Sequence, residues 1–357
     1  MRRFSTLAVI SLACAGIVHA QGRPIDWPFY GGDAQRTGWE RRDSRITKEN
    51  VKDFQLVLKR KLDNKSKGPR SLTPPVILGN LISYRGFKEL AFVAGASDNL
   101  WAIDADLDRM FWQKHLDSSK IAKSSCSGSA GAVPSLIPPV NFAGGRPPRG
   151  AARPATPQGP RGILSGGGFG AARPIFAVSS DGKLHVLNTS TGDDQSPALN
   201  FLPANARASS LTVFAGAIYT TTSGGCGGTP DGVWTIDLSA PEPHVATFAL
   251  DGGGASGLGG LAVGSDGTVY VQSGSKLLAL TPKDLKLKQS FTSSSNVTPV
   301  VFPYKGRDLI VSAGNGGRLY LLDSGSLTPL YQVCRCEDRA WGRWVLSWRS
   351  APRQLAG

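Results

Sequence analysis

Apolar runs separated by glycine turns are clearest near the end of the chain, in Asp308–Leu330. Leu309–Ser312 is a run of apolar and small residues, and Arg318–Leu322 reads as a returning strand. Between them, Asn315–Gly317 supplies the positive φ angles that a tight hairpin needs. Asp323–Gly325 then ends the second strand. Because a single hairpin cannot bury its own apolar face, this pattern predicts that the chain contains further copies.

Four other segments share the pattern of a polar turn, a Leu or Val, and an aliphatic residue before Asp, Asn or Thr. The five segments are Ser97–Asp104, Asp181–Asn188, Pro230–Asp237, Gly274–Thr281 and Gly316–Asp323. Their last residues are 84, 49, 44 and 42 positions apart. A period of about 40–50 residues with strand patterning is typical of a propeller blade. The sequence therefore predicts an all-β fold, a β-propeller of four-stranded blades, with a β-sandwich or another β-repeat array as the alternative.

The predicted repeats occupy residues 71–333 and include one oversized step. The blades are expected at Ser71–Leu116, Phe176–Leu187, Leu211–Ile236, Gly260–Leu280 and Thr298–Leu322. The step of 84 residues indicates either a degenerate blade or an insertion within one blade. Pro138–Ala172 is rich in Gly, Ala, Pro and Arg and has little strand patterning. Such a segment buries too little apolar surface to offset its ordering entropy, so we interpret it as an inserted, basic loop.

The repeat pattern stops just after Tyr331. Arg343–Leu346 resembles a strand of a sixth, incomplete repeat, whereas the rest of residues 334–357 is Arg-rich and lacks strand patterning. We hypothesise that the chain is truncated or frameshifted relative to a closed propeller of six to eight blades.

The N-terminus predicts export. Met1–Ala20 has a charged start, a short apolar core and a small-residue cleavage site after Ala20, as in a secretory signal peptide. We therefore expect a periplasmic or extracellular protein without a transmembrane span. In an oxidising compartment disulfides form, and Cys126 and Cys226, both in Gly/Ser-rich stretches, are the best candidate pair. The alternative is that both are unpaired loop residues.

Residues 21–70 form an N-terminal segment before the first blade. Asp26–Asp33 is aromatic and turn-rich, and we expect it to pack over the outside of the core. Thr47 is placed to cap a short helix. Gln55–Lys61 alternates enough to be a strand, which would close the ring.

Composition and charge narrow the classes of partner. The formal net charge is +14, and the chain has 44 glycines. A basic balance suits nucleic acid, but the Lys and Arg residues are scattered and accompany no nucleic-acid-binding motif. Anionic lipid or polysaccharide explains the charge equally well.

The N-terminus and the blades together resemble a known superfamily. Trp27–Asp33, followed by Ile46–Phe54, resembles the start of pyrroloquinoline quinone (PQQ) dependent dehydrogenases and related propellers. The blades resemble its tryptophan-docking repeat, which has Ala-x-Asp, then Gly and Trp at intervals of four. The matching residues are Ala102, Asp104 and Trp112 in one copy, where Asp108 replaces the Gly, and Asn188 and Gly192 in the next, where Ser196 replaces the Trp. Asp237 and Asp323 occupy the same repeat position as Asp104.

This resemblance implies PQQ with Ca²⁺ and an aspartate base, if the chain is an enzyme. The sequence has no adjacent Cys-Cys pair, and no catalytic, cofactor-binding or metal-binding residue can be assigned from it. The repeat aspartates are expected to bond at strand ends, Trp112 to pack between blades, and His185 to be a strand or loop residue. The templates Gly-x-Ser-x-Gly, His-Glu-x-x-His and Gly-Lys-Ser/Thr are absent.

Two classes of function remain. The leading hypothesis is an exported, non-catalytic PQQ-like propeller that acts as a binding or assembly scaffold for a protein partner, or that binds a polysaccharide or another anionic surface. The alternative is a PQQ-dependent alcohol or sugar dehydrogenase, or a degenerate relative of one.

Overall fold

The computed structural model describes residues 25–40, 46–56, 59–64, 72–83, 86–96, 98–116, 132–137, 173–251, 254–255, 257–293, 295, 297–337 and 344–350. Within these ranges the structure is almost entirely β, and the helical element is one 3₁₀ turn, η1 (Val51–Asp53). No helix in the described ranges has the length and apolar character needed to cross a membrane. The predicted signal peptide and the predicted insertion at 138–172 lie outside the described residues.

The strands form five antiparallel sheets, and each sheet follows the chain order. The first contains β1 (Val76–Ser83), β2 (Gly86–Ala94), β3 (Asn99–Asp104) and β4 (Arg109–His115). The second contains β5 (Ser135–Leu136), β6 (Pro174–Val178), β7 (Lys183–Asn188) and β8 (Leu199–Asn200). The third contains β9 (Thr212–Phe214), β10 (Ala217–Thr221), β11 (Gly232–Asp237) and β12 (His244–Ala249). The fourth contains β13 (Leu261–Val263), β14 (Val269–Ser273), β15 (Lys276–Leu280) and β16 (Leu287–Thr292). The fifth contains β17 (Val300–Tyr304), β18 (Arg307–Gly314), β19 (Arg318–Asp323), β20 (Pro329–Glu337) and β21 (Trp344–Ser350).

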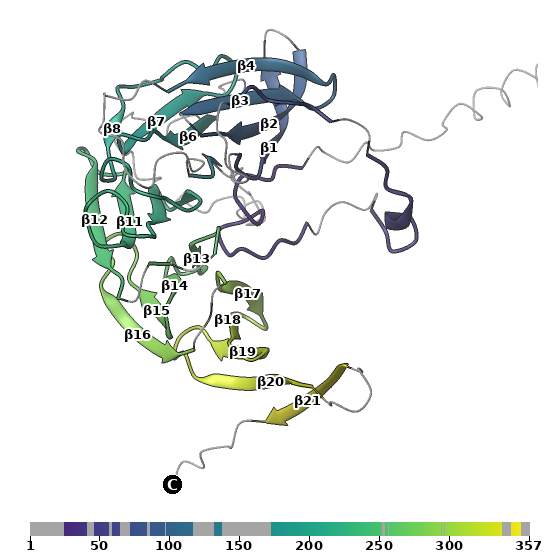
Figure 1. Cartoon of the computed structure of the whole chain (residues 1–357), viewed down its shortest axis with the longest axis vertical. Helices are drawn as coiled ribbons and strands as arrows, with labels where there is room; N and C mark the ends of the chain where they lie inside the picture. Colours follow the sequence, from purple (N-terminus) through teal and green to yellow (C-terminus); the bar gives the residue numbers. More distant parts are fainter. Residues whose placement is uncertain are drawn as a thin grey trace, which may run out of the picture.

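The five sheets stand around a common axis in an arc that is open on one side (Figure 1). Their first strands lie nearest the axis, where β1 contacts β5, β5 contacts β9, and β13 contacts β17. Hydrophobic clusters fill the spaces between consecutive sheets, since buried side chains of two neighbouring sheets occur in each cluster. The predicted fold class, a β-propeller of four-stranded blades, is confirmed.

One position recurs on the second strand of the blades and faces the following blade. In each blade the third strand leads to the repeat Asp, Asn or Thr. The recurring position on the second strand pairs with the third-strand residue that lies two positions before that Asp, Asn or Thr. Phe92, Phe176, Tyr219 and Tyr270 occupy it in the first four blades, and each is at most 1% exposed. In the fifth blade Val311 pairs with Leu321 at this position and is only partly buried. The first four blades, each covered by a following blade, therefore carry a large aromatic side chain at this position, whereas the fifth blade carries a smaller valine.

The N-terminal segment lies on the axis, so its expected position outside the core is wrong. Trp27 forms a two-way backbone bridge with Ile77 of β1. The carbonyl oxygens of Pro28, Ala34 and Gln35 accept hydrogen bonds from β5, β13 and β17 respectively. Phe29 is 2% exposed within the cluster between the second and third blades. Inner strands have one unpaired edge, and this segment supplies the hydrogen-bond partners that those edges would otherwise lack.

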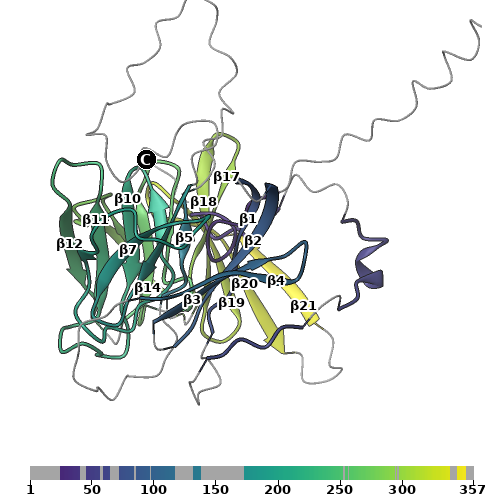
Figure 2. The same cartoon turned by 90° about the horizontal axis from the view of Figure 1, so that it is seen from above.

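The ends of the arc differ from other expectations. Gln55, Leu56 and residues 59–61 lie outside every strand, so no ring-closing strand is present in the described part of Gln55–Lys61. The Thr47 hydroxyl accepts hydrogen bonds from the amides of Glu49 and Asn50, just before η1. The η1 turn lies away from the sheets (Figures 1 and 2). The strand expected in a sixth repeat is β21, and it pairs with β20 as an added strand of the fifth sheet.

The oversized repeat step falls within one blade. β5 and β6 are neighbours in the second sheet, where Ser135 pairs with Phe176 and Leu136 pairs with Ile175. The long segment between them therefore connects two strands of the same blade.

Candidate binding site at the propeller axis

A cavity of about 510 Å³ opens beside the N-terminal segment where it lies on the axis. The N-terminal segment supplies most of its lining between Asp26 and Glu40, and Val213, Phe214, Ser265, Pro303 and Asp308 complete it. These residues come from or adjoin the third, fourth and fifth blades. We call this cavity the axial pocket. Its volume is within the range of about 300–1,000 Å³ that small-ligand sites occupy.

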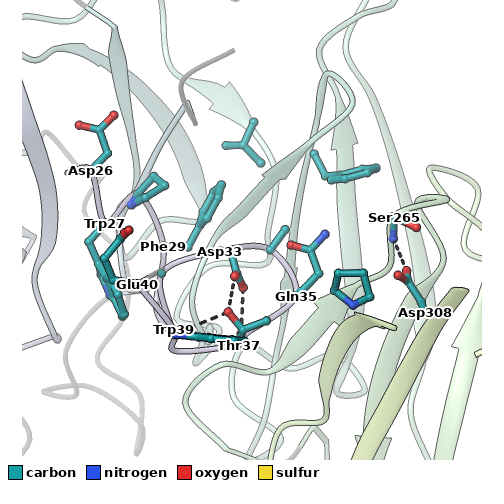
Figure 3. A pocket seen from close by; sticks show the side chains of 16 residues that line it. Asp26, Trp27, Phe29, Asp33, Gln35, Thr37, Trp39, Glu40, Ser265 and Asp308 are labelled. Carbon is teal, nitrogen blue, oxygen red and sulfur yellow. Dashed lines mark hydrogen bonds between the residues drawn. The ribbon is translucent and has the colours of Figure 1, made fainter. Parts of the chain in front are cut away.

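Glycine and a local turn shape one side of the pocket. Gly32 has φ of +83°, and a Cβ there would lie 3.0 Å from the Trp27 indole. Glycine therefore permits both the left-handed backbone and the close approach of the ring. The Asp33 carboxylate accepts hydrogen bonds from the Thr37 amide at 2.9 Å and from the Thr37 hydroxyl. This turn holds the Asp33 carboxylate in the pocket wall (Figure 3).

The pocket wall combines aromatic rings with carboxylates. The aromatic members are Trp27, Phe29, Trp39 and Phe214, and the acidic members are Asp26, Asp33, Glu40 and Asp308. No Lys, Arg or His is among the described residues that line the pocket. In Figure 3, Asp33 lies in the middle, with Asp26 to one side and Asp308 to the other.

The wall carboxylates differ in the cations and hydrogen-bond donors that offset their negative charge. Asp26 forms an ion pair with Arg173 at 2.8 Å and accepts the Gly79 amide at 2.8 Å. The Asp308 Oδ2 accepts the Ser265 amide at 2.7 Å, and Asp308 makes no ion pair within the described residues. Of these two carboxylates, Asp308 therefore has the smaller compensation from a cation.

The side chain of Arg36 joins the N-terminal segment to two blades. The guanidinium is 5% exposed and donates to the Leu261 carbonyl at 2.8 Å, to the Gly259 carbonyl at 3.1 Å and to the Tyr30 carbonyl. It also donates to the hydroxyls of Ser210, at 2.7 Å, and Thr212. Desolvation lowers the pKa of Arg36 to about 10, partly offset by nearby Asp33 and Tyr30. Arg36 thus stays charged at neutral pH, with its donors directed at protein acceptors and away from a ligand.

A Ser–His–Asp arrangement, of which only the His and the Asp line a second cavity near β7, does not support hydrolysis. His185 Nδ1 lies 3.0 Å from Asp194 Oδ1, and His185 Nε2 lies 3.1 Å from the Ser179 hydroxyl. However, Ser179 is 3% exposed, does not line the cavity, and donates its proton to Asp181. Ser179 is therefore unavailable as a nucleophile in this arrangement. Burial acts to raise the pKa of Asp194, but hydrogen bonds from Lys114 and His185 outweigh it and lower that pKa.

The repeat-motif residues lie between and at the ends of strands, away from the axial pocket. Asp104 accepts the Leu107 amide and pairs with Arg109 and Lys88. Asn188 accepts the Ser190 amide at 2.7 Å. Asp237 accepts the Ser239 amide, and Asp323 accepts the Gly325 amide. These side chains terminate strands with Asx turns, and Ala102 pairs with Trp112 across β3 and β4.

The motif tryptophan joins two blades. The Trp112 indole N–H donates to the Thr189 carbonyl at 2.9 Å, and the ring lies against Gly192. Two tyrosines make similar contacts further along the chain. The Tyr270 hydroxyl donates to the Ser324 carbonyl, and the Lys283 amide donates to the Tyr219 hydroxyl. The sequence motif indicates the first of these contacts but not the two tyrosines, whose signal is their aromatic position on the second strand.

Replacing Gly192 by Ala is expected to destabilise the first blade junction by about 1–3 kcal/mol beyond its backbone cost. A Cβ at Gly192 would lie 2.9 Å from the Trp112 ring, and its φ is +80°. The matched control is Gly316→Ala, since Gly316 has φ of +73° and nothing within 4 Å of the new Cβ. Urea denaturation of both variants separates the two effects. Equal losses in the two variants would show that the ring contact is unimportant.

Of the two cysteines in the predicted disulfide, Cys226 is among the described residues and Cys126 is not. Cys226 is buried and disulfide-bonded. The pairing with Cys126 stays a prediction.

Sequence comparisons identify no relative. A scan against protein-family models finds no match, and neither does a search of curated proteins.

Solved structures show the class of fold. The chain is similar to quinohemoprotein alcohol dehydrogenase from Comamonas testosteroni, at 15% identity and TM-score 0.51, over 88% of this chain and 50% of that one. It is similar to a europium-containing methanol dehydrogenase, at 13% identity and TM-score 0.53, over 87% and 58%. It is also similar to quinohemoprotein alcohol dehydrogenase ADHIIG from Pseudomonas putida HK5, at 14% identity and TM-score 0.53, over 93% and 52%.

The protein is a β-propeller of four-stranded blades. Its fold is that of the PQQ-like propellers, as the motif resemblance implies. The chain spans about half the length of these solved structures. At these identities the likeness shows fold alone, so activity follows from the site and not from the fold.

Proposed function

We propose that this chain is a non-catalytic propeller that acts as a binding or assembly scaffold and takes its ligand at the axial pocket. The observation that carries this proposal is the occupation of the axis. Residues 27–36 bond to inner strands there, and Arg36 directs its donors at protein acceptors. What remains is a preformed pocket with aromatic walls, which suits recognition of a ligand.

The described pocket does not fit PQQ, the cofactor that the fold implies. PQQ is a tricarboxylate, and the pocket lining contributes four carboxylates and no basic side chain. Like charges at contact disfavour binding. A Ca²⁺ partner would need several oxygen ligands around one point, and no three His, Cys, Asp or Glu side chains among the described residues converge in that way.

Two further features support export and a protein partner. The disulfide at Cys226 suits an oxidising compartment, which agrees with the predicted periplasmic or extracellular location. A protein partner that presents a basic group is favoured over an anionic polysaccharide, because the lining of the pocket is acidic.

A reconstitution experiment tests this proposal against the dehydrogenase alternative. The purified protein is incubated with PQQ and Ca²⁺, freed of unbound cofactor, and assayed for quinone absorbance and for alcohol- or sugar-dependent dye reduction. We expect neither stoichiometric quinone nor dye reduction. Either result, obtained reproducibly and abolished by chelation of Ca²⁺, would overturn the scaffold proposal in favour of a PQQ-dependent enzyme.

A further inference from the structure

We infer that the axial pocket binds a basic side chain, a guanidinium or alkylammonium group, presented by a segment of a partner protein. This inference rests on the proposed scaffold function and names the chemistry of its ligand. The pocket lining provides four aromatic rings, no basic group and four carboxylates, of which Asp26 is paired with Arg173. It therefore forms a local acidic site on a chain whose formal net charge is +14.

The aromatic rings give the pocket a preference for organic cations over hydrated metal ions. Trp27, Phe29 and Phe214 line it, and Trp39 stands at its rim with 63% of its surface exposed. Ring faces attract Arg and Lys cations, and more strongly when the contact is desolvated. A Lys or Arg side chain also carries an apolar stem that can lie against these rings. Ca²⁺ has no such stem and prefers a closed oxygen cage.

Two polar side chains in the pocket are available to such a ligand. Asp308 lines the pocket and uses its Oδ2 for the Ser265 amide, which leaves Oδ1 as a further acceptor. The Gln35 side chain lines the pocket and makes no hydrogen bond within the described residues. A charge-assisted bond to Asp308 would orient the cation, and the Gln35 amide could bond to the backbone that carries it.

Long-range repulsion does not prevent this binding. The ionic atmosphere at physiological salt screens charges beyond about 8 Å. The wall carboxylates act at contact distance, whereas most basic residues lie elsewhere on the chain. We therefore expect affinity that falls with added salt, without fast electrostatic steering.

Calorimetric titration with three capped tripeptides tests the inference. The probes are acetyl-Gly-Arg-Gly-amide, acetyl-Gly-Lys-Gly-amide and the neutral analogue with citrulline in place of arginine. We expect the arginine peptide to bind at least tenfold more tightly than the citrulline peptide, and more weakly as NaCl rises. Equal binding of the two, or binding of neither, would overturn the inference. Acetyl-arginine-amide binding as tightly as the tripeptide would indicate a small free cation and overturn the protein-segment assignment.

Matched variants locate the binding site. Asp308→Asn keeps an oxygen for the Ser265 amide and removes the charge, so at least a fivefold loss of arginine-peptide affinity is expected with an unchanged melting temperature. Glu40→Gln is the second variant, with a loss in the same direction. Asp251→Asn and Glu242→Gln are the controls, since both residues are exposed and lie outside the pocket lining. Unchanged affinity in Asp308→Asn and Glu40→Gln would place the binding elsewhere and overturn the inference.

Failure of the cationic-ligand inference can be distinguished from failure of the proposed scaffold function. If quinone binds stoichiometrically or dye reduction is seen, and chelation of Ca²⁺ abolishes that result, the scaffold function fails. If neither quinone nor the arginine peptide binds, the scaffold function stands and only the assignment of a cationic ligand is wrong.

Discussion

Replacing Arg36 by Met is expected to lower the free energy of unfolding by about 3 kcal/mol. The change removes the side-chain donors to the carbonyls of Tyr30 and Leu261. The Gly259 carbonyl also loses a donor, but it keeps the Ser210 hydroxyl and the Leu261 amide. Each buried acceptor left without a donor costs about 1–3 kcal/mol. Part of this loss is offset, because Met also removes the desolvation that lowers the pKa of Arg36 to about 10. The measurement is urea denaturation followed by tryptophan fluorescence.

Two control variants test the cause of that loss. Arg36→Lys keeps the charge but not the planar fork of donors, so an intermediate loss is expected. Arg60→Met removes an arginine whose side chain is 30% exposed and pairs with Asp108, and it should cost less than about 1 kcal/mol. If Arg36→Met unfolds at the same urea concentration as the wild type, the N-terminal segment is not anchored by this side chain.

Replacing Trp112 by Ala is expected to cost about 3–5 kcal/mol. The ring packs between the first two blades, 5.7 Å from the Phe92 ring, and donates a hydrogen bond to the Thr189 carbonyl. Removing the ring leaves a cavity that these two sheets can only partly close. Thermal and urea unfolding, followed by far-UV circular dichroism, measure the loss.

A graded series separates packing from hydrogen bonding at this junction. Trp112→Phe keeps much of the ring and loses the donor, so about 1–3 kcal/mol is expected, including the carbonyl left without its partner. Trp39→Ala removes a tryptophan that is 63% exposed and should change stability by less than about 1 kcal/mol. A loss for Trp112→Ala no larger than that for Trp39→Ala would refute the inter-blade role of Trp112.

The repeating part of the fold was predictable because its signal is local. Each blade carries its own turn, its own strand and its own terminating Asp, Asn or Thr within a few residues, as in Gly316–Asp323. The period of these signals then predicts the architecture. The packing of Trp112 between blades was likewise expected, because this residue matches the Trp of the tryptophan-docking repeat that the sequence resembles.

The axial pocket was not predictable, because it depends on contacts between distant parts of the chain. Asp33 and Asp308 line the same pocket although the first four blades lie between them in sequence. An aromatic, turn-rich segment such as Asp26–Asp33 is equally compatible with the outside of a core. Its axial position depends on the unpaired edges of inner strands, which exist only after the sheets assemble. The buried Arg36 had no sequence signal that distinguishes it from the chain's many other basic residues.

The position of the N-terminal segment has a consequence for the order of folding. Trp27 bonds to the first blade and Gln35 bonds to Val301 of the last, so the segment connects the two ends of the open arc. During synthesis the segment emerges first, yet its docking surface is complete only after β17 has formed. Contacts of such long sequence separation slow folding, whereas stacked repeats can form one after another. We therefore expect blades to form early, and the final, slow phase of folding to be the docking of residues 27–36 on the axis.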